Sequence, residues 1–185
     1  LNNGTVEFTG SSEDAVNKYV QLNTIFINTE LAERTDRIGT GELKFTKVKL
    51  LNRSEVVTDI FTQGEDIVVE LEYIVTNKNY NFAGCHFSIN LFDANENHLF
   101  CHQSSLDGLS FTDKTILSKQ SIRFILKNSP FKVGEYKLSC DLVNKGVYVD
   151  ALDNISSFNI IEGNVYNNIR PISSGMIAVD GEWLI

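Results

Sequence analysis

Apolar and polar side chains alternate along much of this chain after Gly39. Residues 64–76 show the pattern most regularly: one face carries Ile67, Val69, Leu71, Tyr73 and Val75, and the other carries Asp66, Glu70 and Glu72. Successive side chains of a β-strand point to opposite faces, so this period of two is typical of a strand with one buried face. The chain is therefore expected to consist of strands that each bury one face in a shared core.

The same alternation recurs in residues 41–52, 84–93, 97–104, 118–127, 134–144, 147–149, 156–161 and 175–184. Within residues 41–52 the pattern slips between Phe45 and Val48, which predicts a β-bulge near Thr46 and Lys47. Turn-forming residues separate the segments, notably at 93–97 and 144–146. The predicted fold class is all-β: an antiparallel, immunoglobulin-like or jelly-roll-like β-sandwich, with no helix expected after Gly39.

The beginning of the chain follows another pattern. Residues 4–20 indicate a short strand, a turn at Gly10 and an amphipathic helix capped by Ser11 or Ser12. This strand–helix stub is too small to bury a core of its own, which suggests the tail of another domain. The predicted division is therefore such a tail at 1–22, a linker at 23–38, the β-sandwich at 39–162, and a connector with a last strand at 163–185.

Charge and composition exclude several classes of function. The formal net charge is −8, which argues against binding to nucleic acid or to an anionic membrane surface. No apolar run approaches the roughly 20 residues that a membrane-spanning helix needs, and the start does not resemble a signal peptide. Cys85, Cys101 and Cys140 all lie in strand patterns, which favours free, buried thiols of a cytoplasmic protein over one disulfide with a spare thiol.

Motifs for catalysis are scarce in this sequence. It has no glycine-rich phosphate loop, no Gly-x-Ser-x-Gly elbow and no Cys-x-x-Cys pair. Glu70 and Glu72 lie on one strand face, where a solubilising sheet edge explains them better than an acid/base pair does. The chain is therefore expected to be neither an enzyme nor a holder of a cofactor.

All three histidines lie on the two arms of the hairpin predicted from residues 84–93 and 97–104. If residue 92 pairs with 98, then 90 pairs with 100, 88 with 102 and 86 with 104, while Leu99 and Cys101 face the core. One outer patch then collects the residues that could bind a ligand, which are His86, Ser88, Asn90, Phe100, His102, Gln103, Ser104 and Asp107.

Three interpretations of this patch compete. A zinc site needs three or four converging ligands, and no carboxylate or thiolate completes a set here, so no metal is expected. A solvated strand face with no ligand is the simplest alternative. A carbohydrate-binding surface is the third, because an aromatic ring stacks on the apolar face of a sugar while amides, carboxylates and imidazoles bind its hydroxyls.

An ordered series of strings resembles a known family. The strings are GTGELKFTKVKLLN at 39–52, FTQGEDIVVELEY at 61–73, FSINLFD at 87–93, LDG at 106–108 and VGEYKL at 133–138. Together they resemble, over residues 38–162, the C-terminal domain of the Wzt-type ATP-binding subunit of ABC transporters that export O-antigen polysaccharide. The stub, with Gly4-x-Val6 and Val16-x-x-Tyr19, then resembles the closing strand and helix of an ABC nucleotide-binding domain whose ATPase core is absent here.

The resemblance implies a non-catalytic module that recognises the terminus of a lipid-linked O-antigen polysaccharide. It implies a cytoplasmic place at the inner face of the inner membrane, with the transporter's membrane subunit reached through the missing ATPase domain. It also implies a homodimer, for which residues 176–185 are the segment that could be exchanged between protomers or could return to their own sandwich. A ligand-free dimerisation or structural domain of the ATPase is the rival interpretation.

Overall fold

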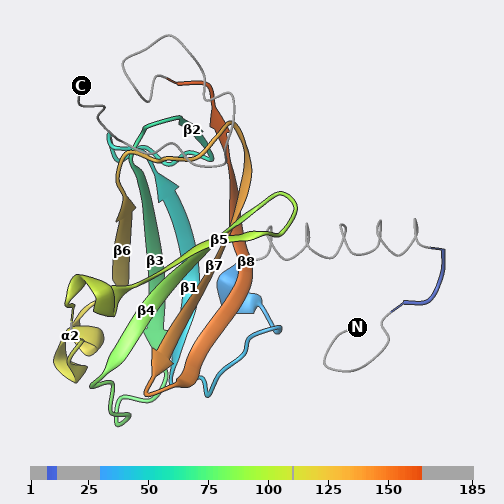
Figure 1. Ribbon diagram of the computed structural model, residues 1–185. Coiled ribbons are helices and arrows are strands. Elements are labelled where there is room, and N and C mark those ends of the chain that lie inside the picture. The colour runs from blue at the N-terminus through green and yellow to red at the C-terminus, as the bar shows by residue number, and fades with distance from the viewer. Residues whose placement is uncertain (1–7, 12–29, 110, 164–185) are drawn as a thin grey trace, which may run out of the picture.

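The computed structural model describes residues 8–11, 30–109 and 111–163, and in this part of the chain two β-sheets pack face to face (Figure 1). The smaller sheet has the order β1-β3-β6, and the larger has the order β2-β8-β7-β4-β5. The strands are β1 (Leu43–Leu51), β2 (Ile60–Thr62), β3 (Ile67–Val75), β4 (Cys85–Asp93), β5 (His98–Gln103), β6 (Ser121–Leu126), β7 (Gly134–Asn144) and β8 (Val147–Ile161). The predicted all-β sandwich is confirmed.

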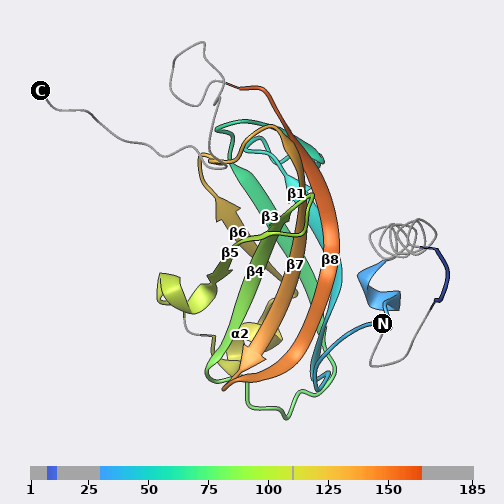
Figure 2. The same cartoon turned by 45° about the vertical axis from the view of Figure 1, so that its right-hand side comes forward.

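The core lies between the two sheets, whose strands Figure 2 shows from a second direction. The alternation predicted its members well on β3, β4 and β7: Leu71, Phe87 and Leu138 are each at most 5% exposed. Five phenylalanines, Phe45, Phe61, Phe82, Phe131 and Phe158, are among the largest fully buried side chains. Burial of such rings contributes much of the stability of a sandwich of this size.

Two local predictions from the sequence are confirmed. The pairing of β1 with β3 shifts register between Phe45 and Lys47, so the bulge lies where the apolar pattern slips. Lys145 and Gly146, at the turn between β7 and β8, both have positive φ, as a tight type I′ hairpin turn requires. This turn joins β7 and β8, the two longest strands, which pair with each other over nearly their whole length.

Other expectations were wrong. Residues 147–161 form one 15-residue strand rather than two. Its pairing with β7 shifts register between Leu138 and Cys140 and again between Leu142 and Val143, so the strand continues where the apolar pattern breaks. The short strand β2 was not predicted and pairs in parallel with β8, whereas the other neighbouring strands of the described region are antiparallel. Cys85 and Cys140 are buried as expected, but Cys101 is exposed.

Helical segments also occur after Gly39, against expectation. A 3-10 helix, η2 (Ser104–Asp107), follows β5, and α2 (Asp113–Ser118) lies at the end of the sandwich where β6 begins (Figure 1). The Thr112 side chain caps α2 by accepting a hydrogen bond from the Thr115 N–H, and Ile116 is fully buried. A six-residue helix gives too little periodicity for sequence patterns to reveal it.

The side of the sandwich where β1 meets β8 is closed by residues 31–41, and we call it the sealed edge. Ile38 and Ala151 exchange two backbone hydrogen bonds, and the N–H groups of Thr40 and Gly41 donate to β8. A 3-10 helix, η1 (Leu31–Glu33), places Leu31 in the core. Residues 31–38, assigned to the linker from the sequence, therefore pack on the sandwich.

An ion pair completes the sealed edge. Arg37 Nη1 lies 2.6 Å from Asp150 Oδ2, and the same oxygen accepts the Phe45 N–H at 2.7 Å. Arg37 Nη2 donates to the Phe45 carbonyl, so both backbone groups of Phe45 on the outer side of β1 are satisfied. Burial raises the pKa of Asp150, although the Phe45 N–H and Arg37 both oppose that rise.

The predicted stub at 1–22 and the predicted last strand at 175–184 lie largely or wholly outside the described residues. The division into domains therefore stays a prediction. No helix within residues 30–109 and 111–163 has the length and apolar character needed to cross a membrane.

Candidate functional site

The hairpin of β4 and β5 is where the predicted patch was placed, and its pairing differs from the prediction. Phe92 does pair with His98, but Leu91 then pairs with Phe100 and Ile89 with His102. One extra residue in β5 causes this shift, which is a β-bulge opposite the Leu91–Phe92 step. Because side chains alternate along a strand, a slip of one residue moves the rest of β5 to the opposite face.

The bulge divides the predicted patch between two faces. Phe100 and His102 turn toward the core side, where the Phe100 ring stacks on Phe131 at 6.0 Å and the His102 ring lies 5.0 Å from Phe124. Ser88 and Asn90 stay on the outer face of β4, opposite Gln103 and Cys101. The prediction that Phe100 and His102 share a face with Asn90 and Ser88 was therefore wrong.

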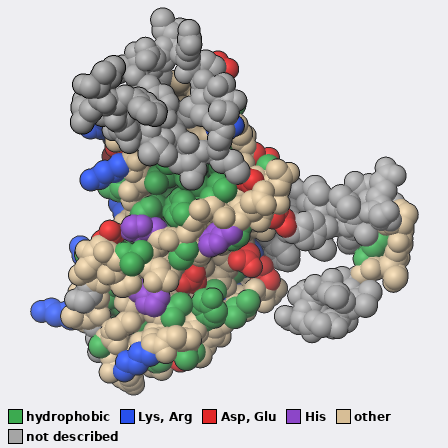
Figure 3. All heavy atoms as spheres, in the orientation of Figure 1, with side chains coloured by type: hydrophobic (Ala, Val, Ile, Leu, Met, Phe, Trp, Pro, Cys, Tyr) green, Lys and Arg blue, Asp and Glu red, His purple; other side chains and the backbone are tan. Residues whose placement is uncertain are grey.

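The remaining predicted residues also fall into these two groups. His86 alternates with the buried Cys85 and Phe87 and so lies on the outer face of β4. Ser104 and Asp107 belong to η2, and the Ser104 hydroxyl accepts the Phe87 N–H at 3.1 Å. Figure 3 shows the three histidines, in purple, around apolar side chains over β4 and β5.

We call the outer side of β4, with its neighbours on β5 and β7, the outer face. Its aromatic element is Phe92, whose ring stacks on His98 at 4.8 Å between centroids. Two residues away, Asn90 donates a 3.0 Å hydrogen bond to Asp141 on β7. Ser88 is 2% exposed, and its hydroxyl finds no hydrogen-bond partner among the described residues. An aromatic pair, an amide and a carboxylate therefore lie close together on one face of the larger sheet, next to a buried hydroxyl.

Sequence reasoning missed Phe92, His98 and Asp141 as parts of this face. Phe92 has the same parity as Asn90 and Ser88, so alternation along β4 alone could have included it. His98 follows from its correctly predicted pairing with Phe92. Asp141 could not have been found in this way, because its position opposite Ser88 depends on β7 being the next strand of the sheet.

The far side of the sandwich, between β5 and β6, has no counterpart of the sealed edge among the described residues, and we call it the open edge. A cleft of about 50 Å³ enters the core there, and we call it the edge cleft. Its lining includes the polar residues His102, Ser104, Asp107 and Arg123. The rest of the lining is apolar and consists of Val69, Leu71, Phe87, Ile89, Leu109, Ile122 and Phe124. His102 Nε2 lies 2.9 Å from Asp107 Oδ2.

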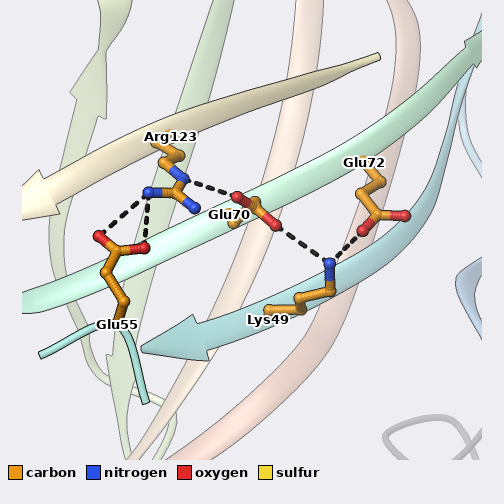
Figure 4. A network of polar contacts seen from close by, with 5 residues as sticks. All are labelled: Lys49, Glu55, Glu70, Glu72 and Arg123. Carbon is orange, nitrogen blue, oxygen red and sulfur yellow. Dashed lines mark hydrogen bonds and ion pairs between the residues drawn. The ribbon is translucent and has the colours of Figure 1, made fainter. Parts of the chain in front are cut away.

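Charged side chains on the outside of the smaller sheet form one network of ion pairs (Figure 4). Arg123 bridges Glu55 and Glu70, and Lys49 bridges Glu70 and Glu72. The hydrogen bond from Arg123, followed by that from Lys49, lowers the pKa of Glu70. β3 is the central strand of its sheet, so Glu70 and Glu72 do not mark a solubilising edge as predicted. Their pairing with cations supports a structural role.

Other chemistry finds little support in the described residues. No three His, Cys, Asp or Glu side chains among them converge in a way that could hold a metal ion. Cys101 lies on the outer face, where burial and then the charge of Asp141 raise the pKa of its thiol. A protonated thiol is a poor nucleophile. The outer face is therefore better suited to binding than to covalent catalysis.

The fold and these two surfaces define a class of protein, a two-sheet β-sandwich domain with a polar and aromatic strand face. The family model of the Wzt C-terminal domain matches residues 34–177. That match covers most of the chain, which therefore belongs to the Wzt C-terminal domain family.

A solved structure agrees on the fold. A crystal structure of the C-terminal domain of Wzt is similar, with a TM-score of 0.62 and 12% sequence identity, and the match covers 87% of this chain and 95% of that one. At this identity the likeness shows the fold alone. None of the curated proteins compared with this chain gives a significant match.

Two further structures are less similar. A β-glucuronidase of Parabacteroides merdae has a TM-score of 0.39 at 11% identity, covering 64% of this chain and 13% of that one. The soluble domain of PmoD from Methylocystis sp. has a TM-score of 0.36 at 13% identity, covering 66% of this chain and 95% of that one. These low scores carry no argument about this chain.

Proposed function

We propose that this chain is a non-catalytic carbohydrate-binding module that recognises the terminus of a lipid-linked O-antigen polysaccharide for export by an ABC transporter. The outer face is its binding surface. The observation that carries the proposal is the row formed by the Phe92–His98 stack and the Asn90–Asp141 pair on neighbouring positions of one sheet. Membership of the Wzt C-terminal domain family supports the context of the transporter.

The chemistry of this row matches the two sides of a sugar. A pyranose has an apolar face of C–H groups that packs on an aromatic ring, and Phe92 is half-buried and supplies such a ring. Its hydroxyls donate and accept hydrogen bonds, which Asn90 and Asp141 complement because one is an amide and the other a carboxylate. His86 and Gln103 extend the polar area along β4 and β5.

Ser88 is a weaker candidate for contact with a ligand. A buried hydroxyl without a partner costs free energy, since its hydrogen bonds to water are lost on folding. The Ser88 hydroxyl lies opposite Gln103 and Asp141 and is buried, so a ligand does not reach it while these neighbours stay in place. The predicted residues Asn90, His86 and Gln103 thus remain candidates together, with Phe92 replacing Phe100 as the aromatic member.

The wider context follows from the family in the same proposal. The domain acts in the cytoplasm at the inner face of the inner membrane, joined through an ATPase domain to the membrane subunit of the transporter. It works as a homodimer. A shallow polar surface implies a dissociation constant of about micromolar to millimolar, because few ligand atoms lose water. Two copies in one dimer raise the avidity.

The test is a titration of the 185-residue chain with the O-polysaccharide of the producing strain and with an unrelated polysaccharide, followed by NMR or calorimetry. We expect saturable binding to the cognate polymer alone. The variants Phe92→Ala and Asn90→Ala should each weaken it about tenfold or more, which corresponds to the roughly 1.4 kcal/mol of one good contact. Ile125→Ala, which changes an exposed apolar side chain on β6, is the matched control and should bind normally.

A different result would favour the rival function. If neither polymer binds and the chain forms a tight dimer in solution, the domain is better explained as a ligand-free dimerisation module. Binding that survives both Phe92→Ala and Asn90→Ala would place the carbohydrate site away from the outer face.

A further inference from the structure

The edge cleft differs in chemistry from the outer face. Its interior is formed by apolar side chains from both sheets, including Leu71 of β3, Ile89 of β4 and Ile122 of β6. His102 and Asp107 at its rim are 33% and 54% exposed, whereas the hydroxyl of the buried Ser104 already accepts the Phe87 N–H. A ligand group that enters the cleft must therefore be apolar, while the part that stays outside is polar.

The size of the cleft limits this group. One water molecule needs roughly 10–15 Å³ of such space, so about 50 Å³ accommodates about three to five atoms of that size. A pyranose ring with its hydroxyls is larger than that and does not fit whole. A methyl group, or a substituent of two or three heavy atoms, does fit.

The charged side chains at the rim of the edge cleft limit which kind of ligand can carry the apolar group. Asp107 accepts from His102, and a carboxylate has acceptor positions left over for ligand hydroxyls. Arg123 also lines the cleft, but its guanidinium is held by Glu70 and Glu55 on the outside of the smaller sheet. Among the described residues that line the cleft, no cation is therefore free to pair with a phosphate or carboxylate beside Asp107, which disfavours anionic ligands.

We propose that the edge cleft is a second subsite, which receives the methyl group of a 6-deoxy sugar or an equally small apolar substituent of a neutral glycan. The sugar ring stays at the open edge, where its hydroxyls donate to Asp107. This inference rests on the proposed function in that the ligand is a carbohydrate. It assigns to Asp107, with His102 beside it, a role separate from that of the outer face.

Pairs of sugars that differ by one oxygen test the inference. L-Rhamnose is compared with L-mannose, and L-fucose with L-galactose, by NMR titration of the 185-residue chain at concentrations high enough to detect millimolar binding. We expect the deoxy sugar of at least one pair to bind about fourfold more tightly, which is the effect of burying one apolar carbon. The signals of Ile122 and Leu109 should shift on binding.

Two variants separate the cleft from the rest of the domain. Ile122→Phe fills the cleft from β6, and Leu109→Ala removes a wall contributed by a side chain that is 54% exposed and so of little importance for folding. Both should remove the preference for the deoxy sugar. Phe92→Ala, on the outer face, should leave that preference in place while it weakens binding of the polysaccharide.

The outcomes distinguish this inference from the proposed function. If the two sugars of each pair bind equally well while Phe92→Ala still weakens binding of the polysaccharide, the cleft is not a subsite. The outer face then remains the proposed binding surface. A preference that survives both cleft variants also overturns it. If neither the simple sugars nor the polysaccharide bind, both proposals are wrong.

Discussion

The sealed edge and the open edge of this sandwich differ in how their outermost strands are covered. At the sealed edge, the connector before β1 supplies hydrogen bonds to β8, and Arg37 and Asp150 satisfy the outward backbone groups of Phe45. At the open edge, between β5 and β6, aromatic side chains and the His102–Asp107 pair surround a cleft instead. One edge is closed by long-range polar bonds, and the other is left accessible.

This difference indicates that the sealed edge contributes mainly to stability and the open edge mainly to recognition of ligands. Buried, fully paired polar groups rigidify a structure and are costly to disturb. Exposed edges with spare acceptor groups have low local stability and are free to contact ligands. We therefore expect substitutions at the sealed edge to affect unfolding, and substitutions at the open edge to affect binding.

The largest effect is expected from Asp150→Ala. This change leaves the half-buried Arg37 without its anion and removes the acceptor of the Phe45 N–H, and breaking such a buried pair costs about 3–5 kcal/mol. Urea unfolding at neutral pH measures the loss. Asp153→Ala on the same strand is the control, because its side chain is exposed, and it should stay within about 0.5 kcal/mol. Equal losses for the two variants would show that the ion pair does not hold this edge.

Gly39→Ala is expected to come next. Gly39 has φ of +144°, and an added Cβ would lie 2.5 Å from the Val149 carbonyl oxygen, so the connector would have to move away from β8. Strain of this kind costs about 1–3 kcal/mol for the backbone alone. Gly146→Ala, with φ of +83° and open space around the new carbon, is the matched control in thermal unfolding. If Gly146→Ala is the more destabilising, close approach at Gly39 is not important.

A smaller effect is expected for Glu70→Gln, and it should depend on pH. Since Arg123 and Lys49 lower the pKa of Glu70 in the folded state, its stabilising contribution is complete above the ordinary value of about 4.5. It is lost as the pH falls from there through the lowered folded value. The difference in unfolding free energy between the native chain and the variant should be about 1 kcal/mol at pH 7 and shrink toward zero in acid. A difference that grows in acid would contradict this.

The smallest effect on stability is expected from His102→Ala. His102 is a third exposed and its partner Asp107 is more than half exposed, so their pair should contribute less than about 1 kcal/mol. Guanidinium unfolding checks this value. A loss as large as that of Asp150→Ala would mean that the open edge is closed as firmly as the sealed one.

Much of the fold was predictable, because local pattern and final environment agree. β3, β4 and β7 bury the side chains that their alternation indicates, and the phase slip at Phe45 marked the real bulge. The unpredicted parts are those that depend on distant residues. β2 forms only because Ile60–Thr62 lie beside the end of β8, and the polar Asp150 sits inside a strand because Arg37 lies against it.

The candidate site was predictable on one strand and not on the other. Alternation places Ser88 and Asn90 correctly, because β4 keeps one register with β7 throughout its length. On β5, an insertion of one residue near Leu99 exchanges the faces, and nothing in the sequence of the hairpin indicates which residue is left unpaired. Whether the residues of the two faces bind carbohydrate stays a prediction.

The bulge in β5 also has a consequence for natural variation. Because β5 is the outermost strand of its sheet, a gain or loss of one residue there disturbs no further strand. A single codon inserted or deleted in this hairpin would turn Phe100 and His102 to the outer face and Cys101 and Gln103 to the core side. Related chains could thus acquire a different ligand preference in one genetic step, while the sandwich and its sealed edge persist unchanged.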